Sequence, residues 1–314
     1  MAQEHELLAT PENVFWGHFD ATRRPVLEVD SGDTVYMHTL PACLEEELPK
    51  DSSRITPDHA AAIEHHRSDR GTGPHFMTGP VYVRGARPGH VLQVDILTTE
   101  VRQDWGFASI LPLLGALPDE FTDYETIHID IDQTGKQAVL PWGTVLDLDP
   151  FFGIMAVAPP RAWGRIGSPE PRAHGGNIDN KDLRPGTTLY LPVFEEGALF
   201  SAGDGHGRQG HGEVCITALE TALNGRFRLT VRDDMSLSQP FAESDQWLMS
   251  MGFNVDLDDA AATAIREMIP RVAETGNLSR NHAYMLLSLV ADLHVTQVVD
   301  GNKGVHMIMP KNCL

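Results

Sequence analysis

Hydrophobic and polar residues alternate in short stretches along most of the chain. In the clearest stretch, Leu92, Val94 and Ile96 alternate with Gln93 and Asp95, which is the pattern of a strand with one buried face. The turn ARPGH joins this strand to an earlier one. Further stretches that predict strands are residues 25–38, 187–194, 213–220 and 226–232. We therefore expect a mainly β body, built as a sandwich or a barrel-like sheet.

From residue 256 the apolar residues take the spacing of a helix. They are Ile265, Met268, Ile269 and Val272 in the stretch DLDDAAATAIREMIPRVAE. Asp258 or Asp259 is expected to cap this helix at its N-terminus, and Pro270 to kink it or end it early.

A second helix is predicted in LSRNHAYMLLSLVAD, with Ser279 as its cap, and a strand follows at residues 293–300. The expected fold is therefore mainly β, with a smaller α+β portion at the C-terminus. In this division residues 1–255 form a β-rich body, and residues 256–314 form an α/β tail that packs on it as part of one compact unit.

Composition narrows the function classes. The 44 acidic residues outnumber the 24 basic ones, for a net charge of -20, which disfavours binding to nucleic acid or to an anionic membrane. The N-terminus lacks the pattern of a signal peptide, and the most apolar stretch, residues 151–160, is too short to span a bilayer. Three widely spaced cysteines fit a reducing compartment, so we expect a cytoplasmic protein with a small, uncharged partner.

Groups that bind metals or transfer protons concentrate in two glycine-rich segments, which we interpret as loops. The segment at residues 203–213, GDGHGRQGHGE, carries Asp204, His206, His211 and Glu213. The segment at residues 173–182, AHGGNIDNKD, carries His174, Asn177, Asp179, Lys181 and Asp182. Imidazole and carboxylate groups together suit zinc or another divalent ion. If neighbouring strands lead into both segments, the two clusters meet at one sheet edge.

Each of these residues also has a simpler interpretation. A glycine-rich turn with Asp and His is often only a solvated loop, and His174 alone could be a structural hydrogen-bonding residue. His75, before the strand that contains Val81, could be an ordinary loop histidine. Cys215 lies two residues after Glu213 and could be a nucleophile, but on the predicted strand at 213–220 we expect it to be a buried, inert side chain.

Several long motifs resemble the acetamidase/formamidase family. They are HGGNIDNKDL, LYLPVFEEGALFSAGDGHGRQGHGEV, TGPVYVRGARPGHVLQVDIL, DWGFASILPLLGALPDEF and VTQVVDGNKGVHMIMPK, and the resemblance runs from about Asn13 to the end. His211 departs from the family pattern, which has an acid there, and Ala173 stands where Arg or Pro is usual. The resemblance implies a mainly β fold, a homo-oligomer and hydrolysis of short amides such as formamide or acetamide. It also implies a divalent metal, with zinc favoured over calcium, and chemistry that does not use a cysteine.

Together these observations predict a metal-activated water. Metal ligands would be His174, Asp204 and His206, with Glu213 or Asp179 as a candidate further ligand. Catalytic roles would go to Glu213 or Asp179 as proton acceptor and Asn177 as donor to the amide oxygen, with His75 and Lys181 as positioning candidates. Trp105, Phe107 and Phe152 would form the substrate wall. Two alternatives stay open: a metal-dependent hydrolase or lyase for another small substrate, and a non-catalytic β-sandwich binding module.

Overall fold

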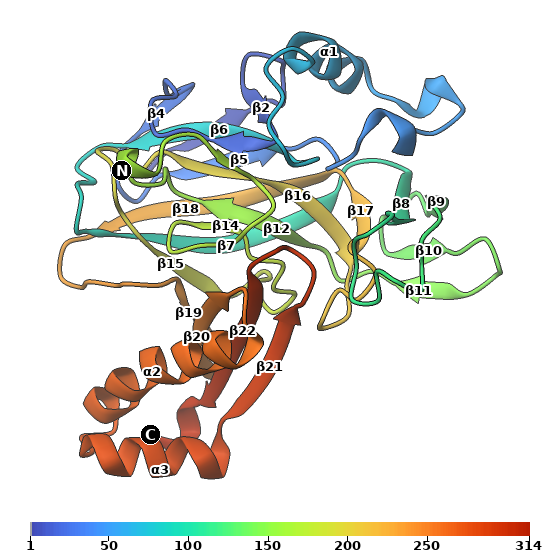
Figure 1. Cartoon of the computed structure of the whole chain (residues 1–314). Coiled ribbons are helices and arrows are strands. Elements are labelled where there is room, and N and C mark those ends of the chain that lie inside the picture. The colour runs from blue at the N-terminus through green and yellow to red at the C-terminus, as the bar shows by residue number, and fades with distance from the viewer. Residues whose placement is uncertain (1) are drawn as a thin grey trace.

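The computed structural model describes residues 2–314. As predicted, the chain is mostly β, and its two large sheets are open rather than closed into barrels (Figure 1). The nine-stranded sheet has the order β1 (Glu4–Leu7), β5 (Thr34–His38), β18 (Leu223–Arg232), β7 (Val91–Val101), β15 (Thr188–Pro192), β19 (Phe241–Glu243), β20 (Trp247–Asn254), β22 (Lys303–Pro310) and β21 (Asp292–Gln297).

The second large sheet has eleven strands and carries most of the candidate chemistry. Its main path is β11 (Val145–Asp147), β10 (Gln137–Val139), β9 (Glu125–Ile131), β8 (Trp105–Ile110), β17 (Leu219–Thr221), β16 (Phe200–Arg208), β12 (Phe151–Ala156) and β14 (Gly175–Asn177). Strand β6 (Phe76–Val83) pairs with β16 and brings in β2 (Val14–Trp16) and β4 (Leu27–Val29). Two short strands, β3 (His18–Phe19) and β13 (Ile166–Gly167), pair with each other.

The main hydrophobic core lies between the two large sheets. Phe227 of the nine-stranded sheet contacts Phe152 and Phe200 of the other, with ring centroids 5.1 and 5.6 Å apart. Apolar residues that alternate on β7 and β18 fill the same layer, as the sequence pattern predicted for 90–97 and 226–232. The body is therefore a sandwich of two open sheets.

Three α-helices occur among the described residues: α1 (Pro57–His66), α2 (Leu257–Thr275) and α3 (Arg280–Val290). The prediction for the cap of α2 was wrong, because Asp256 accepts the hydrogen bonds from the amides of Asp258 and Asp259. Pro270 does not end the helix, which continues for five more residues. Ser279 caps α3 as predicted, by accepting from the amide of His282.

Helices α2 and α3 lie together at the end of the molecule opposite α1 (Figure 1). Helix α2 packs on β20 and β22, so the predicted tail adds strands to the sheet of the body. The division into a body (1–255) and a tail (256–314) stays a prediction. Among residues 2–314, no helix combines the length and the apolar character that crossing a membrane requires.

Two segments have a different secondary structure from the one predicted. Residues 203–208, which we interpreted as loop, belong to strand β16, where glycines at 203 and 205 let the neighbouring backbones approach closely. Residues 213–218, predicted as strand, form a turn. Glu213 and Ile216 there have positive φ angles of 45° and 90°, which are unfavourable for an extended run of residues.

Candidate functional site

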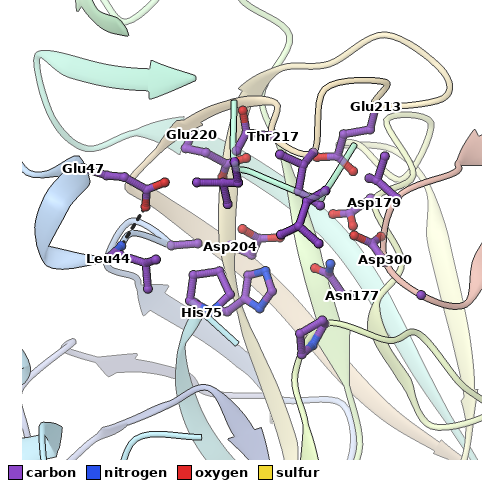
Figure 2. A pocket seen from close by; sticks show the side chains of 18 of the residues that line it. Leu44, Glu47, His75, Asn177, Asp179, Asp204, Glu213, Thr217, Glu220 and Asp300 are labelled. Carbon is purple, nitrogen blue, oxygen red and sulfur yellow. Dashed lines mark hydrogen bonds between the residues drawn. The ribbon is translucent and has the colours of Figure 1, made fainter. Parts of the chain in front are cut away.

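A cavity of about 370 Å³ opens beside strands β16, β17 and β14 (Figure 2). Both glycine-rich segments reach it: Asn177 and Asp179 come from one, and Asp204, His206 and Glu213 from the other. His75, which precedes β6, lies in the same cavity. The structure thus brings together all the predicted catalytic residues and two of the three predicted metal ligands.

The central pair stands on strand β16. Asp204 and His206 are two residues apart, so both side chains face the cavity, and both are almost completely buried. Asp204 has a φ of +56°, and Asp179 and Glu213 also have positive φ, at 52° and 45°. Such backbone conformations are unfavourable for residues other than glycine and concentrate at functional sites. Three acids of this cavity share this feature.

Gly153 on strand β12 makes room for the carboxylates. A Cβ atom at this position would overlap the side-chain oxygens of both Asp204 and Asp179. The Gly153 carbonyl also accepts hydrogen bonds from the amides of Ile178 and Asp179, at 2.9 and 3.2 Å. Gly153 therefore sets the separation between β12 and the segment that carries Asp179.

Replacing Gly153 with alanine is expected to lower kcat/KM for a short amide by roughly a hundredfold, because it displaces two acids by the width of a methyl group. The strand should survive, since alanine is compatible with its extended backbone. Steady-state kinetics and a thermal melt of the purified variant measure both effects. An unchanged kcat/KM would show that the positions of Asp179 and Asp204 do not matter.

One nitrogen of the His206 imidazole lies close to three carboxylates. Its Nε2 lies 3.2 Å from Asp204 Oδ2, 3.3 Å from Glu220 Oε2 and 3.8 Å from Asp179 Oδ1. On the other side, Nδ1 lies 2.8 Å from Gln209 Oε1, and the Gln209 amide group donates to the Asp179 carbonyl at 2.8 Å. That second bond fixes the Gln209 oxygen toward His206, so Nδ1 carries a proton and donates it. This arrangement directs Nε2 toward the carboxylates, where either a proton or a metal cation can occupy it.

The cavity holds more buried acid than base. Its buried acids are Glu47, Asp179, Asp204, Glu213, Glu220 and Asp300. Burial and the neighbouring Asp204 carboxylate raise the pKa of Asp179 to about 7, and burial raises the pKa of Glu220 to about 7. Burial, followed by the charge of Asp179, raises the pKa values of Glu213 and Asp300 well above the usual range.

Asp204 and His206 behave differently from the other groups. Burial alone would raise the pKa of Asp204, but the positive charge of His206 and the hydrogen bonds and charges of other neighbouring side chains together outweigh it and lower that pKa. Burial alone would lower the pKa of His206, but the carboxylates of Glu220 and Asp204 raise it well above its usual value. One imidazolium cannot balance the remaining acids, so the cluster requires protons or a metal cation.

Several oxygens in the cluster have no hydrogen-bond partner among residues 2–314. They are Asp179 Oδ1 and Oδ2, Glu213 Oε2, Glu220 Oε2, Asp300 Oδ2 and Asn177 Oδ1. Three sets of side chains bring ligand atoms within 4.8 Å of one another: Asp179 with Asp204 and His206, His206 with Glu213 and Glu220, and Asp179 with Glu213 and Asp300. Unpartnered buried carboxylates next to a histidine whose Nε2 faces them fit a divalent cation.

His174 does not join this cluster. No metal-ligand group formed by the described residues includes it, and its ring packs edge-on against Phe19 and Trp163. His174 lies in the turn before β14, and Gly175 and Gly176, both with positive φ, separate it from Asn177. The side chain that lies with Asp204 and His206 is instead Asp179.

His174 should instead make the fold sensitive to acid. Burial lowers its pKa to about 3, whereas in the unfolded chain it protonates near 6.5, so the unfolded state binds more protons between these values and stability falls as the pH falls. Wild type should therefore lose about 2 kcal/mol more than His174→Leu between pH 7 and pH 5, at about 1.4 kcal/mol per pH unit below 6.5. Urea denaturation at both pH values tests this; parallel losses in the two proteins would refute it.

One of the three aromatic residues that were predicted to form the substrate wall lines the cavity. Phe107 lines the cavity, together with Leu111, Leu114, Ile216 and Val299. Trp105 packs behind it and donates from its indole nitrogen to the Arg54 carbonyl. Phe152 faces the core between the sheets, because its neighbour Gly153 occupies the face of β12 that borders the cavity.

Lys181 and Cys215 lie outside the cavity. Lys181 Nζ is 3.7 Å from Asp182 Oδ1 on the surface side of its loop. Cys215 is exposed in the turn at residues 213–218, so the prediction of a buried strand cysteine was wrong; the positive φ of Ile216 breaks the strand there.

Sequence reasoning missed Glu220, Asp300 and Gln209. Glu220 was inside the stretch predicted as a strand, and Asp300 ended another, but nothing in either pattern indicates that they face the same cavity. Glu47, the last of three consecutive acids, is also buried in the cavity wall, where its carboxylate accepts from the Leu44 amide. Only long-range pairing of strands brings these residues together.

Residues 24–165 and 168–313 match the Acetamidase/Formamidase family. The chain is 28% identical to a putative formamidase of Schizosaccharomyces pombe over 305 aligned residues, which cover 72% of this chain and 74% of that one. An acetamidase from Bacillus halodurans superposes with a TM-score of 0.84 at 32% identity, over 98% of this chain and 97% of that one. A predicted acetamidase/formamidase from Thermoanaerobacter tengcongensis gives 0.85 at 26% identity, over 99% and 96%. The chain therefore belongs to the acetamidase/formamidase family and is an amide-hydrolysing enzyme.

Proposed function

We propose that the protein hydrolyses short aliphatic amides of the formamide and acetamide type to a carboxylate and ammonia, in the cavity around Asp204 and His206, with a water activated by a divalent cation. The observation that carries this proposal is the surplus of buried carboxylates with unpartnered oxygens around one histidine. Zinc is our first choice of ion and calcium the second, because the set of donors is one imidazole with several carboxylates.

Asp179, Asp204 and His206 would hold the cation, since their ligand atoms lie within 4.8 Å of one another. When bound, such an ion polarises a carbonyl oxygen and lowers the pKa of a coordinated water to about 7. Gln209 supports this set by fixing the tautomer of His206 and the carbonyl of Asp179.

Proton transfer falls to Glu213. Its carboxylate is buried at the edge of the ligand set, and burial raises its pKa, so it is a stronger proton acceptor than an exposed glutamate. In the reaction the water oxygen bonds to the amide carbon, Glu213 takes the water proton, and the same proton passes to the nitrogen as the C–N bond breaks. Asn177, whose amide faces the cavity, is placed to donate to the amide oxygen.

His75 acts as a neutral positioning residue in this scheme. Burial lowers its pKa, and its Nδ1 lies 2.7 Å from the Ser168 hydroxyl. The apolar wall around Phe107 excludes water from the substrate side of the cavity. The negative charge of the protein does not repel an uncharged amide. A cytoplasmic location and a homo-oligomeric state stay predictions.

The substrate class is tested by measuring the release of ammonia and of the carboxylate. Wild type is expected to form ammonia and the matching carboxylate in equal amounts from formamide, acetamide or propionamide. Cys215→Ser should be as active as wild type, because residue 215 lies outside the cavity. Absence of ammonia from all three amides would contradict the proposal, and loss of activity in Cys215→Ser would indicate a cysteine amidase instead.

A further inference from the structure

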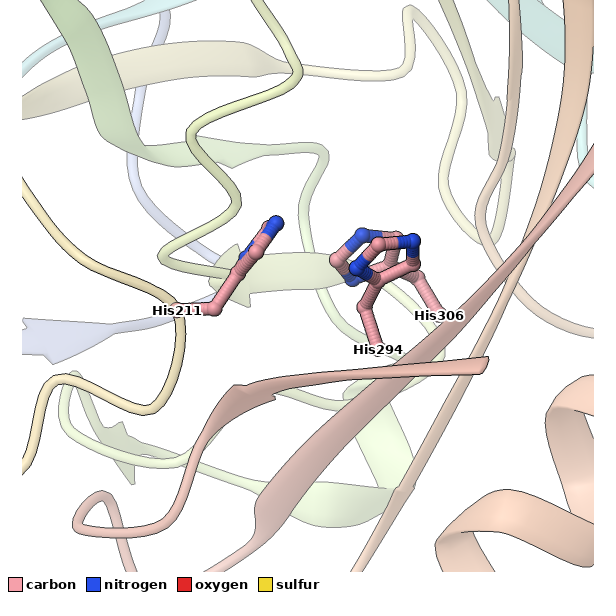
Figure 3. Close-up of side chains that lie close together, drawn as sticks. All are labelled: His211, His294 and His306. Carbon is pink, nitrogen blue, oxygen red and sulfur yellow. The ribbon is translucent and has the colours of Figure 1, made fainter. Parts of the chain in front are cut away.

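Three histidines, His211, His294 and His306, lie close together (Figure 3), and two of them contact Asp182. His211, His294 and His306 each offer a ring nitrogen within 4.8 Å of the others. Their ring centroids are 4.9 to 5.1 Å apart. None of the three lines the cavity described above, so this cluster is separate from the proposed catalytic site.

The backbone fixes where these rings stand. His294 and His306 are directly paired across strands β21 and β22, and their rings are almost parallel, at 6°. His211 approaches from the turn after β16. Its neighbour Gly212 donates to the Thr296 carbonyl at 2.9 Å and accepts from the Val298 amide at 3.1 Å. This ladder holds His211 against the C-terminal hairpin.

The ring nitrogens are oriented as in metal sites. His306 Nδ1 lies 2.7 Å from the Thr296 hydroxyl, which leaves Nε2 to face Asp182 Oδ2 at 3.3 Å. His211 Nε2 lies 3.5 Å from the same oxygen. Zinc bonds of about 2.0–2.1 Å in a tetrahedron separate neighbouring ligand atoms by about 3.3–3.4 Å. Both nitrogen–oxygen distances are close to this value.

The charges around the cluster favour neutral imidazoles. Burial lowers the pKa of His211 to about 4, and burial also lowers the pKa of His306, so both keep a lone pair for a metal at neutral pH. Asp182 remains ionised, because His306 and Lys181 offset the effect of its burial and lower its pKa. The one opposing group is Lys181, whose ammonium lies 3.7 Å from Asp182 Oδ1, the oxygen that faces away from the rings.

We propose that His211, His294, His306 and Asp182 form a second metal site, for a divalent transition-metal ion that prefers imidazole, such as Zn²⁺. Three nitrogens and one carboxylate oxygen give a closed four-coordinate set of the kind that structural zinc sites use.

The position of this set in the chain gives the ion a structural role. Asp182 follows Asp179 by three residues, and His211 precedes Glu213 by two. The loop between β21 and β22 carries Asp300. An ion bound to the four ligands ties together the three segments that supply Asp179, Glu213 and Asp300 to the cavity.

Titration with Co²⁺ alone tests the site, because tetrahedral Co²⁺ absorbs visible light strongly. The experiment uses chelator-stripped Asp204→Asn protein, in which the cavity has lost a ligand and only the histidine cluster is intact. We expect the intense visible bands to saturate at about one Co²⁺ per chain. Adding His294→Gln should weaken binding by at least about a hundredfold and remove the bands. His294 is half-exposed, so this substitution should leave the fold intact, which circular dichroism checks.

Two further variants sharpen the result. His282→Gln, at an exposed position on α3, is the matched control and should titrate like its parent. Lys181→Gln should raise the Co²⁺ affinity several-fold, because it removes a positive charge beside Asp182. Identical titrations of His294→Gln and His282→Gln, or binding without the tetrahedral bands, would overturn the proposal. Activity is not the readout, so this outcome is independent of the proposed hydrolysis.

Discussion

Replacing Asp179 with asparagine is expected to lower kcat/KM for acetamide by about a thousandfold or more and, at the same time, to stabilise the metal-free fold. Asp179 is almost completely buried, and neither of its oxygens accepts a hydrogen bond from the described part of the chain. Asparagine has nearly the shape of aspartate but lacks the negative charge that binds the cation. The cavity therefore loses its cation, and the transition state loses roughly 4 kcal/mol of stabilisation.

In the metal-free protein, the same substitution relieves the repulsion between Asp179 and the carboxylates of Asp204 and Asp300. The free energy of unfolding of chelator-stripped protein should rise by about 1–3 kcal/mol.

Asp95 provides the matched control, since it is also a buried aspartate. Its carboxylate accepts hydrogen bonds from Gln93, Thr188 and Arg228 in the other sheet. Asp95→Asn should lower stability by about 1–3 kcal/mol and leave kcat/KM unchanged. Kinetics with urea denaturation separates the two cases. If Asp179→Asn is active and destabilised like Asp95→Asn, Asp179 is an ordinary buried polar residue.

Glu213→Gln is expected to lower kcat by a factor of about 10² to 10⁴, the usual contribution of a general base, while KM and metal content change little. The amide cannot accept the water proton, but it occupies the same volume in the turn at residues 213–218. Metal analysis of the purified variant separates this effect from loss of the cation.

A control with the same chemical change is Glu243→Gln, whose carboxylate pairs with Tyr190 and Lys311 far from the cavity. It should retain the wild-type kcat. If the Glu213→Gln enzyme has a nearly normal kcat, the general base is another acid of the cluster. Glu220 and Asp300 are then the candidates, because they lie outside the proposed ligand set.

Alternation along the chain was sufficient to predict a mainly β body, with sandwich and barrel both left open, and to pair Asp204 with His206. The spacing of two places both side chains on one side of β16, although Asp204 itself has a positive φ. The same alternation failed at residues 213–220, since it reports burial and not φ. The turn there depends on positive φ at Glu213 and Ile216, which apolar patterning cannot indicate.

The composition of the site was less predictable than its location. Asp300 reaches the cavity only because β22 pairs with β20, and Glu220 only because β17 pairs with β16. These pairings span long separations in sequence, so no local pattern indicates them. His174 was misplaced for a different reason: its residue type suits a metal, but it lies in a turn where its ring packs against Phe19 and Trp163.

The most direct test of the central claim, that the buried acids around His206 hold a cation needed for amide hydrolysis, is to strip the protein with a chelator and titrate Zn²⁺ back while following ammonia release from acetamide. The His294→Gln background confines binding to the cavity. The stripped enzyme should be inactive and should recover in proportion to bound Zn²⁺, whereas Asp204→Asn should neither bind nor recover. Undiminished ammonia release by protein that contains no metal would contradict the account.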